Sequence, residues 1–296
     1  MRVPSRIALV FAVICCVGSM FPRKGLCVEI TDDLGRTVRL AQPARRIISL
    51  YGAFSEMLFS IGAGSQVIAR TQADRYPESI VKLPPVGTHM RPNVEIILGL
   101  KPDLVIQSGS RFEAMGELDS LRSAGIPVVV FSPKTFEDIF VTMMRLGVLT
   151  GRESDAQAAV DRLKGRLGAV RSHRAGVRKR PRVFFEIRAE PITAAGRNSI
   201  VQDILEAVGA ENVVKSNKAV VRYNLEELLV SDPDIYIIQK GPMNRNPRDL
   251  GKRIHFDKLR AVREGKMIFV DEFLFSRPGP RCVDAVEQLA VELERL

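Results

Sequence analysis

The sequence has no tryptophan, only three histidines and only four cysteines among its 296 residues. Three of the cysteines, at positions 15, 16 and 27, lie in or beside the amino-terminal segment. A chain that loses residues 1–27 therefore keeps one thiol, Cys282. A single thiol cannot form an internal disulfide, so we expect the hydrophobic cores alone to stabilise the fold.

Motifs of several catalytic classes are also missing. The chain has no Gly-x-Ser-x-Gly, no His-Glu-x-x-His, no Cys-x-x-Cys and no glycine-rich phosphate loop that opens a helix. It has no block of Lys and Arg with interleaved aromatic residues, which is typical of nucleic-acid binding. We therefore expect neither an enzyme nor a nucleic-acid-binding protein.

The amino-terminal segment is typical of a secretory signal peptide. Arg2 and Arg6 precede an apolar run at residues 7–20, which is shorter than the about 20 residues of a membrane-spanning helix. Cleavage after Cys27 predicts a periplasmic protein that starts at Val28. A lipid anchor on one of the three nearby cysteines is the alternative, although none of them follows the small residue that such processing prefers.

Removal of residues 1–27 lowers the formal net charge from +10 to +6, because it removes four basic residues and no acid. This charge is compatible with an anionic ligand, and equally with general solubility.

A fourteen-residue pattern occurs twice. Residues 93–106 (Asn-Val-Glu-Ile-Ile-Leu-Gly-Leu-Lys-Pro-Asp-Leu-Val-Ile) align without a gap to residues 224–237, with six identical positions. In each copy Asn is positioned to cap a short helix, Glu lies in its first turn, Pro ends it and Asp leads into a strand. The repeat predicts two similar α/β lobes, although a helix followed by Pro, Asp and a strand is also common among α/β proteins in general.

Short apolar segments alternate with helical patterns along the chain, which favours doubly wound lobes. Strands are expected at residues 46–50, 67–69, 103–106, 127–131, 182–187, 234–238 and 266–270, and helices at 55–61, 94–98, 113–124, 136–150, 199–208 and 281–296. Apolar residues at helical spacing predict a long connecting helix from residue 153 to about 172. The expected organisation is a first lobe at 28–152, a connecting helix at 153–175 and a second lobe at 176–296.

Several segments, in this order, resemble the periplasmic substrate-binding proteins of ABC importers for ferric siderophores, haem and cobalamin. They are Thr31-Asp32-Asp33-Leu34-Gly35-Arg36-Thr37-Val38, Arg46-Ile47-Ile48-Ser49-Leu50, Ser55-Glu56, Gly62-Ala63-Gly64, Leu83-Pro84-Pro85-Val86-Gly87, Pro92-Asn93-Val94-Glu95, Leu100-Lys101-Pro102-Asp103-Leu104-Val105 and Arg277-Pro278-Gly279-Pro280-Arg281. The resemblance implies two Rossmann-like α/β lobes joined by one rigid helix, a ligand cleft between them and little closure on binding.

The resemblance also implies partners. The protein would be a monomer that delivers its ligand to a membrane permease with a cytoplasmic ATPase, and it would have no cofactor of its own. Glu95 and Glu226, one in each copy of the repeat, match the surface glutamates that bind arginines of the permease. The alternative is that each Glu only stabilises the amino terminus of its own helix.

Ligand contacts are expected from loops that follow strands, where open α/β sheets form their binding crevices. The candidates are Tyr51, His89, Arg91, Arg188, Arg197, Arg222, Tyr223 and Arg277. Arginines match the anionic oxygens of ferric chelates, and His89 is placed to ligate iron or cobalt, to stack on a ligand or to donate a hydrogen bond.

The cargo stays open between a ferric siderophore, haem and cobalamin. Lack of Trp departs from well-known cobalamin binders, and Thr88-His89 stands where the haem subset favours a Tyr. Two alternatives on the same architecture are a zinc or manganese receptor using His89, His173 and His255, and a haem or corrinoid carrier that acts without a permease.

Overall fold

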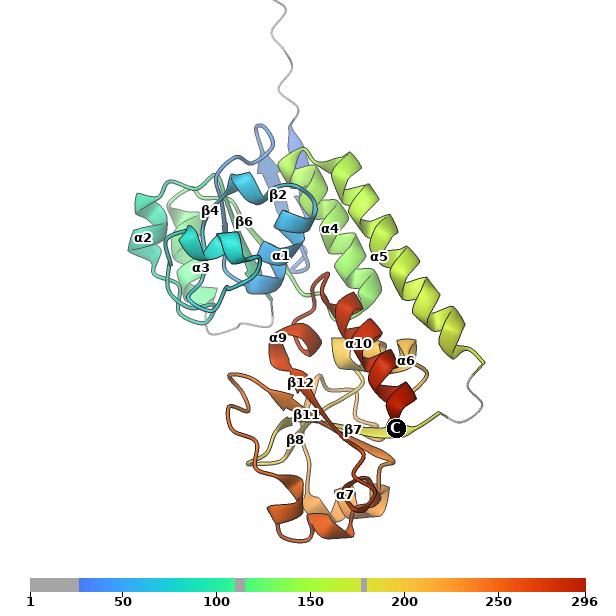
Figure 1. Ribbon diagram of the computed structural model, residues 1–296. Coiled ribbons are helices and arrows are strands. Elements are labelled where there is room, and N and C mark those ends of the chain that lie inside the picture. Colours follow the sequence, from blue (N-terminus) through green and yellow to red (C-terminus); the bar gives the residue numbers. More distant parts are fainter. Residues whose placement is uncertain (1–26, 110–114, 177–179) are drawn as a thin grey trace, which may run out of the picture.

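The computed structural model describes residues 27–109, 115–176 and 180–296. These residues form two α/β lobes, with a long helix running along one side from the first lobe to the second (Figure 1). The predicted signal peptide lies outside the described residues, except for Cys27. Ser110 and Arg111, in the loop after the strand expected at residues 103–106, also lie outside the described residues, and so do residues 177–179, which follow the expected connecting helix.

The first lobe is built on a parallel sheet of four strands in the order β4-β3-β5-β6, with a separate antiparallel hairpin β1-β2. Its elements are β1 (Val28–Thr31), β2 (Thr37–Leu40), β3 (Ile47–Ser49), α1 (Gly52–Ser60), η1 (Gly64–Gln66), β4 (Val67–Ala69), η2 (Glu78–Lys82), α2 (Val94–Gly99), β5 (Leu104–Ser108), α3 (Met115–Ser123), β6 (Val128–Phe131) and α4 (Phe136–Thr150).

The second lobe has a mixed sheet in the order β10-β8-β7-β11-β12, with β9 also on β7. Strands β7, β11 and β12 are parallel, whereas β8 and β10 are antiparallel to their neighbours. The remaining elements are α5 (Glu153–Arg174), β7 (Arg182–Arg188), β8 (Thr193–Ala195), α6 (Ile200–Ala207), β9 (Glu211–Asn212), β10 (Val220–Arg222), α7 (Leu225–Ser231), β11 (Ile235–Lys240), η4 (Leu250–Lys252), η5 (Phe256–Lys258), α8 (Arg260–Arg263), β12 (Met267–Asp271), α9 (Glu272–Phe275) and α10 (Cys282–Arg295).

The expected strands and helices occur within three residues of their predicted bounds. Strands β1, β2, β8, β9 and β10 were not expected. Strands β8, β9 and β10 have only two or three residues each and no extended apolar run, and β1 and β2 have four residues each, with polar and apolar residues in alternation. The second lobe therefore repeats the strand and helix order of the first without repeating its all-parallel sheet.

The sequence repeat corresponds to the same local structure in both lobes. The Asn93 side chain accepts a hydrogen bond from the Ile96 amide at 3.0 Å, and Asn224 accepts one from the Glu227 amide at 2.7 Å, so each caps its helix. After each helix the chain turns through a positive φ at the same position of the repeat, 48° at Lys101 and 34° at Asp232.

The aspartate that follows each Pro of the repeat connects two neighbouring strands of its lobe. Asp103 accepts a hydrogen bond from the Arg46 amide at 2.9 Å, and Asp234 accepts one from the Arg182 amide at 2.8 Å. Each carboxylate thereby joins the start of its own strand to the start of the neighbouring parallel strand. The repeat encodes how two parallel strands are aligned, in addition to the strand and helix order.

The long helix α5 holds the lobes together through apolar contacts. Its buried residues Ala159, Leu163 and Leu167 belong to one hydrophobic cluster that contains residues of both lobes. Smaller hydrophobic clusters cover the outer faces of the two sheets. Because successive residues of a strand point to opposite faces, Ile47 belongs to the shared cluster and Ile48 belongs to the smaller cluster of the first lobe. A shared core of this kind resists large movements of the lobes. Among the described residues, no helix has the length and apolar character needed to cross a membrane.

Candidate functional site

The site lies where the carboxyl edges of the two sheets approach each other. A cavity of about 360 Å³ opens there between the lobes. Its lining comes from both lobes and comprises Glu56, Ala73, Arg75, Tyr76, Asp271, Phe273, Leu274, Arg277 and Arg281. The arrangement is a crevice at the carboxyl ends of parallel strands, the usual ligand position in open α/β sheets.

Tyr51 and His89 form an aromatic pair at the carboxyl edge of the first sheet, and neither is among the residues that line the cavity. Tyr51 follows β3, and its ring centroid is 6.1 Å from that of His89, with an angle of 66° between the two planes. The His89 backbone carbonyl accepts a hydrogen bond from Gln107, a buried residue of β5, at 3.0 Å. The structure therefore brings two of the predicted ligand residues together at the edge of the first sheet.

The loop that carries His89 is a tight turn. The Arg91 amide donates a hydrogen bond to Thr88 Oγ1 at 3.0 Å, and the Thr88 amide donates one to the Arg91 carbonyl at 3.2 Å. Gly87, with φ at 97°, precedes this turn, and a Cβ atom there would lie 2.6 Å from the Arg91 carbonyl oxygen. Only glycine fits this position. The turn leaves Arg91 exposed beside His89.

A row of cations follows the carboxyl edge of the second sheet. Thr193 of β8 pairs with Arg222 of β10 on one side and with Arg188 of β7 on the other. Lys240 ends β11, and it pairs with Asp271 of β12, which lines the inter-lobe cavity. Since neighbouring strands are about 4.8 Å apart, Arg188 and Arg222 lie about 10 Å from one another along this edge. All three cations are exposed.

Two candidates are placed elsewhere. Arg197 lies beyond the end of β8, and because β8 is antiparallel to β7, this end lies toward the amino terminus of β7 and away from the cation row. Tyr223 is 8% exposed and packs against Phe184 in the core of the second lobe, with 5.2 Å between ring centroids. Both residues were expected in the cleft because the sequence does not reveal the antiparallel strands β8 and β10.

The floor of the cleft is a cluster of charged groups that joins the lobes. Arg281, just before α10, donates a hydrogen bond through Nε to Glu56 Oε2 of α1 at 3.2 Å. Arg277 packs close to Gly52 and to Asp74, and its guanidinium lies 4.0 Å from the centroid of the Phe273 ring. The predicted candidate Arg277 therefore lies at the junction of the lobes.

Burial dominates the ionisation of the two carboxyl groups in this cluster. Burial raises the pKa of Glu56 to about 7, although Arg281 and Arg277 oppose the shift. Burial also raises the pKa of Asp74, against hydrogen bonds from Thr71 and the charge of Arg277. The Glu56 carboxyl is therefore protonated in part of the molecules near neutral pH.

Glu56 and Arg281 were not expected from the sequence as site residues. Glu56 and Arg281 are in two of the segments that carry the family resemblance, and this was the available signal. Their contact spans 225 positions of the chain, so only the folded structure shows that the two segments meet.

Glu95 and Glu226 occupy matching positions on the surface. Each is exposed in the first turn of its capped helix, α2 or α7. Within the described residues neither carboxylate forms an ion pair. The repeated pattern thus presents one unpaired carboxylate from each lobe.

The three histidines are on separate elements. His89 is in the turn of residues 88–91, His173 lies near the end of α5 beside Glu294, and His255 precedes η5 in the second lobe. In the part of the chain that the structure describes, no three His, Cys, Asp or Glu side chains are grouped as metal ligands. Cys282 is buried, which raises the pKa of its thiol to about 12.

The geometry agrees with sequence comparison. Residues 47–273 match the family described as periplasmic binding protein. The chain belongs to this family. The resemblance stated from the sequence motifs is therefore confirmed, and so is the prediction of two α/β lobes with a connecting helix.

Family members similar to this chain include transport proteins from several bacteria. It is 28% identical to an uncharacterized ABC transporter substrate-binding lipoprotein YvrC of Bacillus subtilis, over 89% of this chain and 84% of that protein. It is also 28% identical to a vitamin B12-binding protein of Pectobacterium carotovorum, over 90% of this chain and 94% of the other.

Solved structures of the family have the same fold. The chain matches the vitamin B12-binding protein BtuF of Vibrio cholerae with a TM-score of 0.73 and 25% identity, over 85% of this chain and 97% of that one. A possible iron-binding protein of Staphylococcus epidermidis gives a TM-score of 0.75 and 28% identity, over 85% and 99% of the two chains.

Proposed function

We propose that this protein is the extracytoplasmic substrate-binding component of an ABC importer, and that it captures a metal chelate, namely cobalamin, haem or a ferric siderophore. The observation that carries the proposal is the cleft between the lobes, with the exposed Tyr76 ring in its first-lobe lining and a row of cations along the carboxyl edge of the second sheet. Relatives named for vitamin B12 and for iron support the same ligand class. Residues 1–27 would serve as the export signal, either cleaved or bearing a lipid.

The two walls suit different parts of such a ligand. Guanidinium groups bind carboxylate, catecholate and phosphate oxygens through paired hydrogen bonds, which Arg188 and Arg222 would offer together. The ring of Tyr76, which is 49% exposed and lines the cavity from the first lobe, offers an apolar and polarisable surface to a macrocycle or an aromatic chelator. The cleft binds and releases the ligand without chemical change.

Delivery would use the two surface carboxylates. Glu95 and Glu226 are exposed, unpaired within the described residues and held by the capped helices of the repeat. A carboxylate near a helix amino terminus stays available for a bidentate arginine of a permease. Two such contacts, one from each lobe, would orient the cleft toward the membrane.

Titration of the purified protein with cobalamin, haem and a panel of ferric siderophores tests the ligand class. We expect one of them to bind, and the Arg188→Glu/Arg222→Glu variant to bind it at least about tenfold more weakly, since a lost charge-assisted pair costs about 1.5 to 3 kcal/mol. Arg197→Glu, exposed at the other end of the sheet, is the matched control and should leave affinity unchanged. Failure of all three ligand types to bind would refute the proposed ligand class.

Uptake into proteoliposomes containing the permease and its ATPase tests the docking. We expect Glu95→Arg/Glu226→Arg to abolish uptake while ligand affinity stays at the wild-type value. The control carries the same charge reversals on α5, Glu153→Arg/Asp161→Arg, and should transport normally. Normal uptake by the Glu95→Arg/Glu226→Arg variant would show that these residues do not dock the permease.

A further inference from the structure

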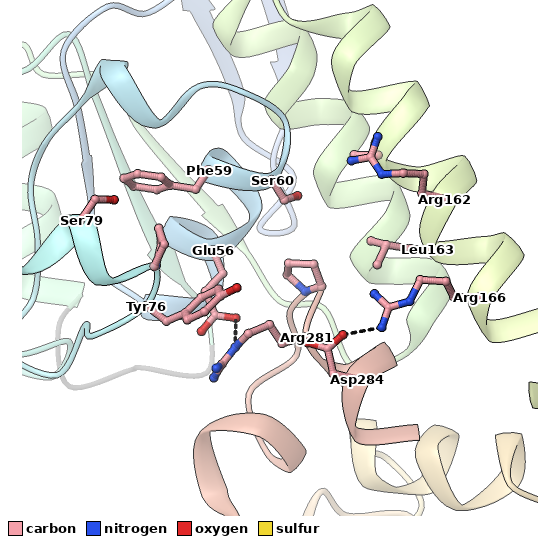
Figure 2. Close-up of a pocket in the computed structure, with 13 residues that line it drawn as sticks. Glu56, Phe59, Ser60, Tyr76, Ser79, Arg162, Leu163, Arg166, Arg281 and Asp284 are labelled. Carbon is pink, nitrogen blue, oxygen red and sulfur yellow. Dashed lines mark hydrogen bonds and ion pairs between the residues drawn. The ribbon is translucent and has the colours of Figure 1, made fainter. Parts of the chain in front are cut away.

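A second cavity, which we call the rear cavity, lies on another side of the lobe junction. Its volume is about 660 Å³, and it is enclosed by α1 of the first lobe, by α5 and by the start of α10 in the second lobe (Figure 2). Phe59, Pro77, Ala159, Leu163 and Pro280 make much of its lining apolar. It therefore contacts both lobes and the helix that connects them.

Two polar groups of the rear cavity lack partners. Ser60 Oγ is buried and has no hydrogen bond, although an unpaired buried hydroxyl is costly. Arg162 of α5 is exposed, and it forms neither an ion pair nor a hydrogen bond within the described residues. Figure 2 shows Ser60 on α1 and Arg162 on α5, on opposite sides of the space between the helices.

The neighbouring arginine differs in this respect. Arg166, one turn further along α5, donates hydrogen bonds to Asp284 at 2.6 Å and to Glu287 at 2.5 Å. Its charge is thus neutralised by α10. Among the three arginines that line the rear cavity, Arg281 also has a partner, the Glu56 carboxyl group, so Arg162 is the one without a partner within the described residues.

The rear cavity and the ligand cleft share a wall. Glu56, Tyr76 and Arg281 line both of them. The Arg281 guanidinium lies 4.2 Å from the centroid of the Tyr76 ring and is held by the hydrogen bond to Glu56. This partition keeps the rear cavity separate from the cleft where the metal chelate is proposed to bind.

We propose that the rear cavity is a second binding site, specific for a small carboxylic acid with an aromatic or otherwise apolar body. The apolar lining takes the body of the acid and Arg162 binds its carboxylate. Such an acid contacts both lobes and α5 at once. The site does not depend on the identity of the cleft ligand.

Equilibrium dialysis with 2-naphthoate tests this site. The protein has no tryptophan, so the naphthoate fluorescence is read against a low background. We expect saturable binding of one naphthoate per protein, and at least about tenfold weaker binding by Arg162→Glu. The uncharged analogue 2-naphthamide should bind weakly and equally to both proteins.

Two further variants locate the binding. Arg171→Glu changes an exposed arginine of the same helix outside the rear cavity, and Arg91→Glu changes an exposed arginine of the cleft; both should bind naphthoate like the wild type. The proposal is overturned if naphthoate does not bind, if Arg162→Glu binds it normally, or if Arg91→Glu is the variant that loses it. Titration of the metal chelates tests the cleft separately, so the two proposals fail independently.

Discussion

The buried carboxyl group of Glu56 makes stability depend on pH in a direction that is unusual for an acidic residue. Its pKa is 4.5 without the fold and about 7 in the folded protein, because burial outweighs the attraction of Arg281 and Arg277. The folded state therefore binds the proton more tightly than the unfolded chain does. This contribution to stability is complete below pH 4.5 and is lost as the pH rises through about 7.

The magnitude follows from the two pKa values. The difference between the two corresponds to about 3 kcal/mol. Most of this, about 2 to 3 kcal/mol, is lost between pH 5 and pH 8. Glu56→Gln keeps the shape of the side chain and an oxygen acceptor for Arg281, but it does not titrate. Between pH 5 and pH 8 we therefore expect the free energy of unfolding of this variant to fall less than that of the wild type, and the difference should equal the amount lost by the Glu56 carboxyl group.

Urea denaturation at several pH values between 5 and 8, followed by circular dichroism, measures the difference. Asp74 titrates in both proteins, and its contribution largely cancels in the comparison. Glu95→Gln, at an exposed site, should keep the wild-type pH dependence. If wild type and Glu56→Gln lose stability in parallel as the pH rises, the Glu56 carboxyl is not protonated by burial and the reasoning is refuted.

Two further predictions concern the second lobe's core and the repeated helix caps. Tyr236→Phe removes the hydrogen bond that the Tyr236 hydroxyl donates to the fully buried Glu186 carboxylate at 2.7 Å. We expect this variant to lose about 1 to 3 kcal/mol in the free energy of unfolding, measured with urea. An unchanged free energy of unfolding would show that other donors satisfy the carboxylate. Asn93→Ala and Asn224→Ala should each cost about 1 kcal/mol, because each removes the side-chain acceptor that caps a short helix. Asn198→Ala, at an exposed position outside the helices, is the control, and equal stability of all three variants would contradict the capping role.

Local sequence signals were sufficient for most of the helices and strands of this protein. Asn, Pro and Asp in the repeat act on their immediate neighbours through a cap, a helix stop and a strand start, so residues 93–106 and 224–237 are interpretable without the fold. The apolar spacing along α5 likewise predicts a buried stripe at any position in the molecule. The exposed positions of Glu95 and Glu226 follow from the first turn of a capped helix.

The composition of the cleft depends on contacts between distant segments. Arg188 and Arg222 lie in one row only because the unpredicted strand β8 runs between their strands, and the same antiparallel strand carries Arg197 away. Tyr223 follows an exposed arginine in sequence, yet its side chain lies on the core side. Such placements depend on strand pairing and register, which local propensity does not determine.

The sequence by itself determined the two lobes, the helix between them and the repeated surface glutamates, because periodicity and capping act within a few residues. The tertiary structure alone decided that Glu56 meets Arg281, that these residues separate two cavities, and which arginines reach the cleft. The physical reason is that burial and pairing of charges arise only where segments far apart in the chain pack together.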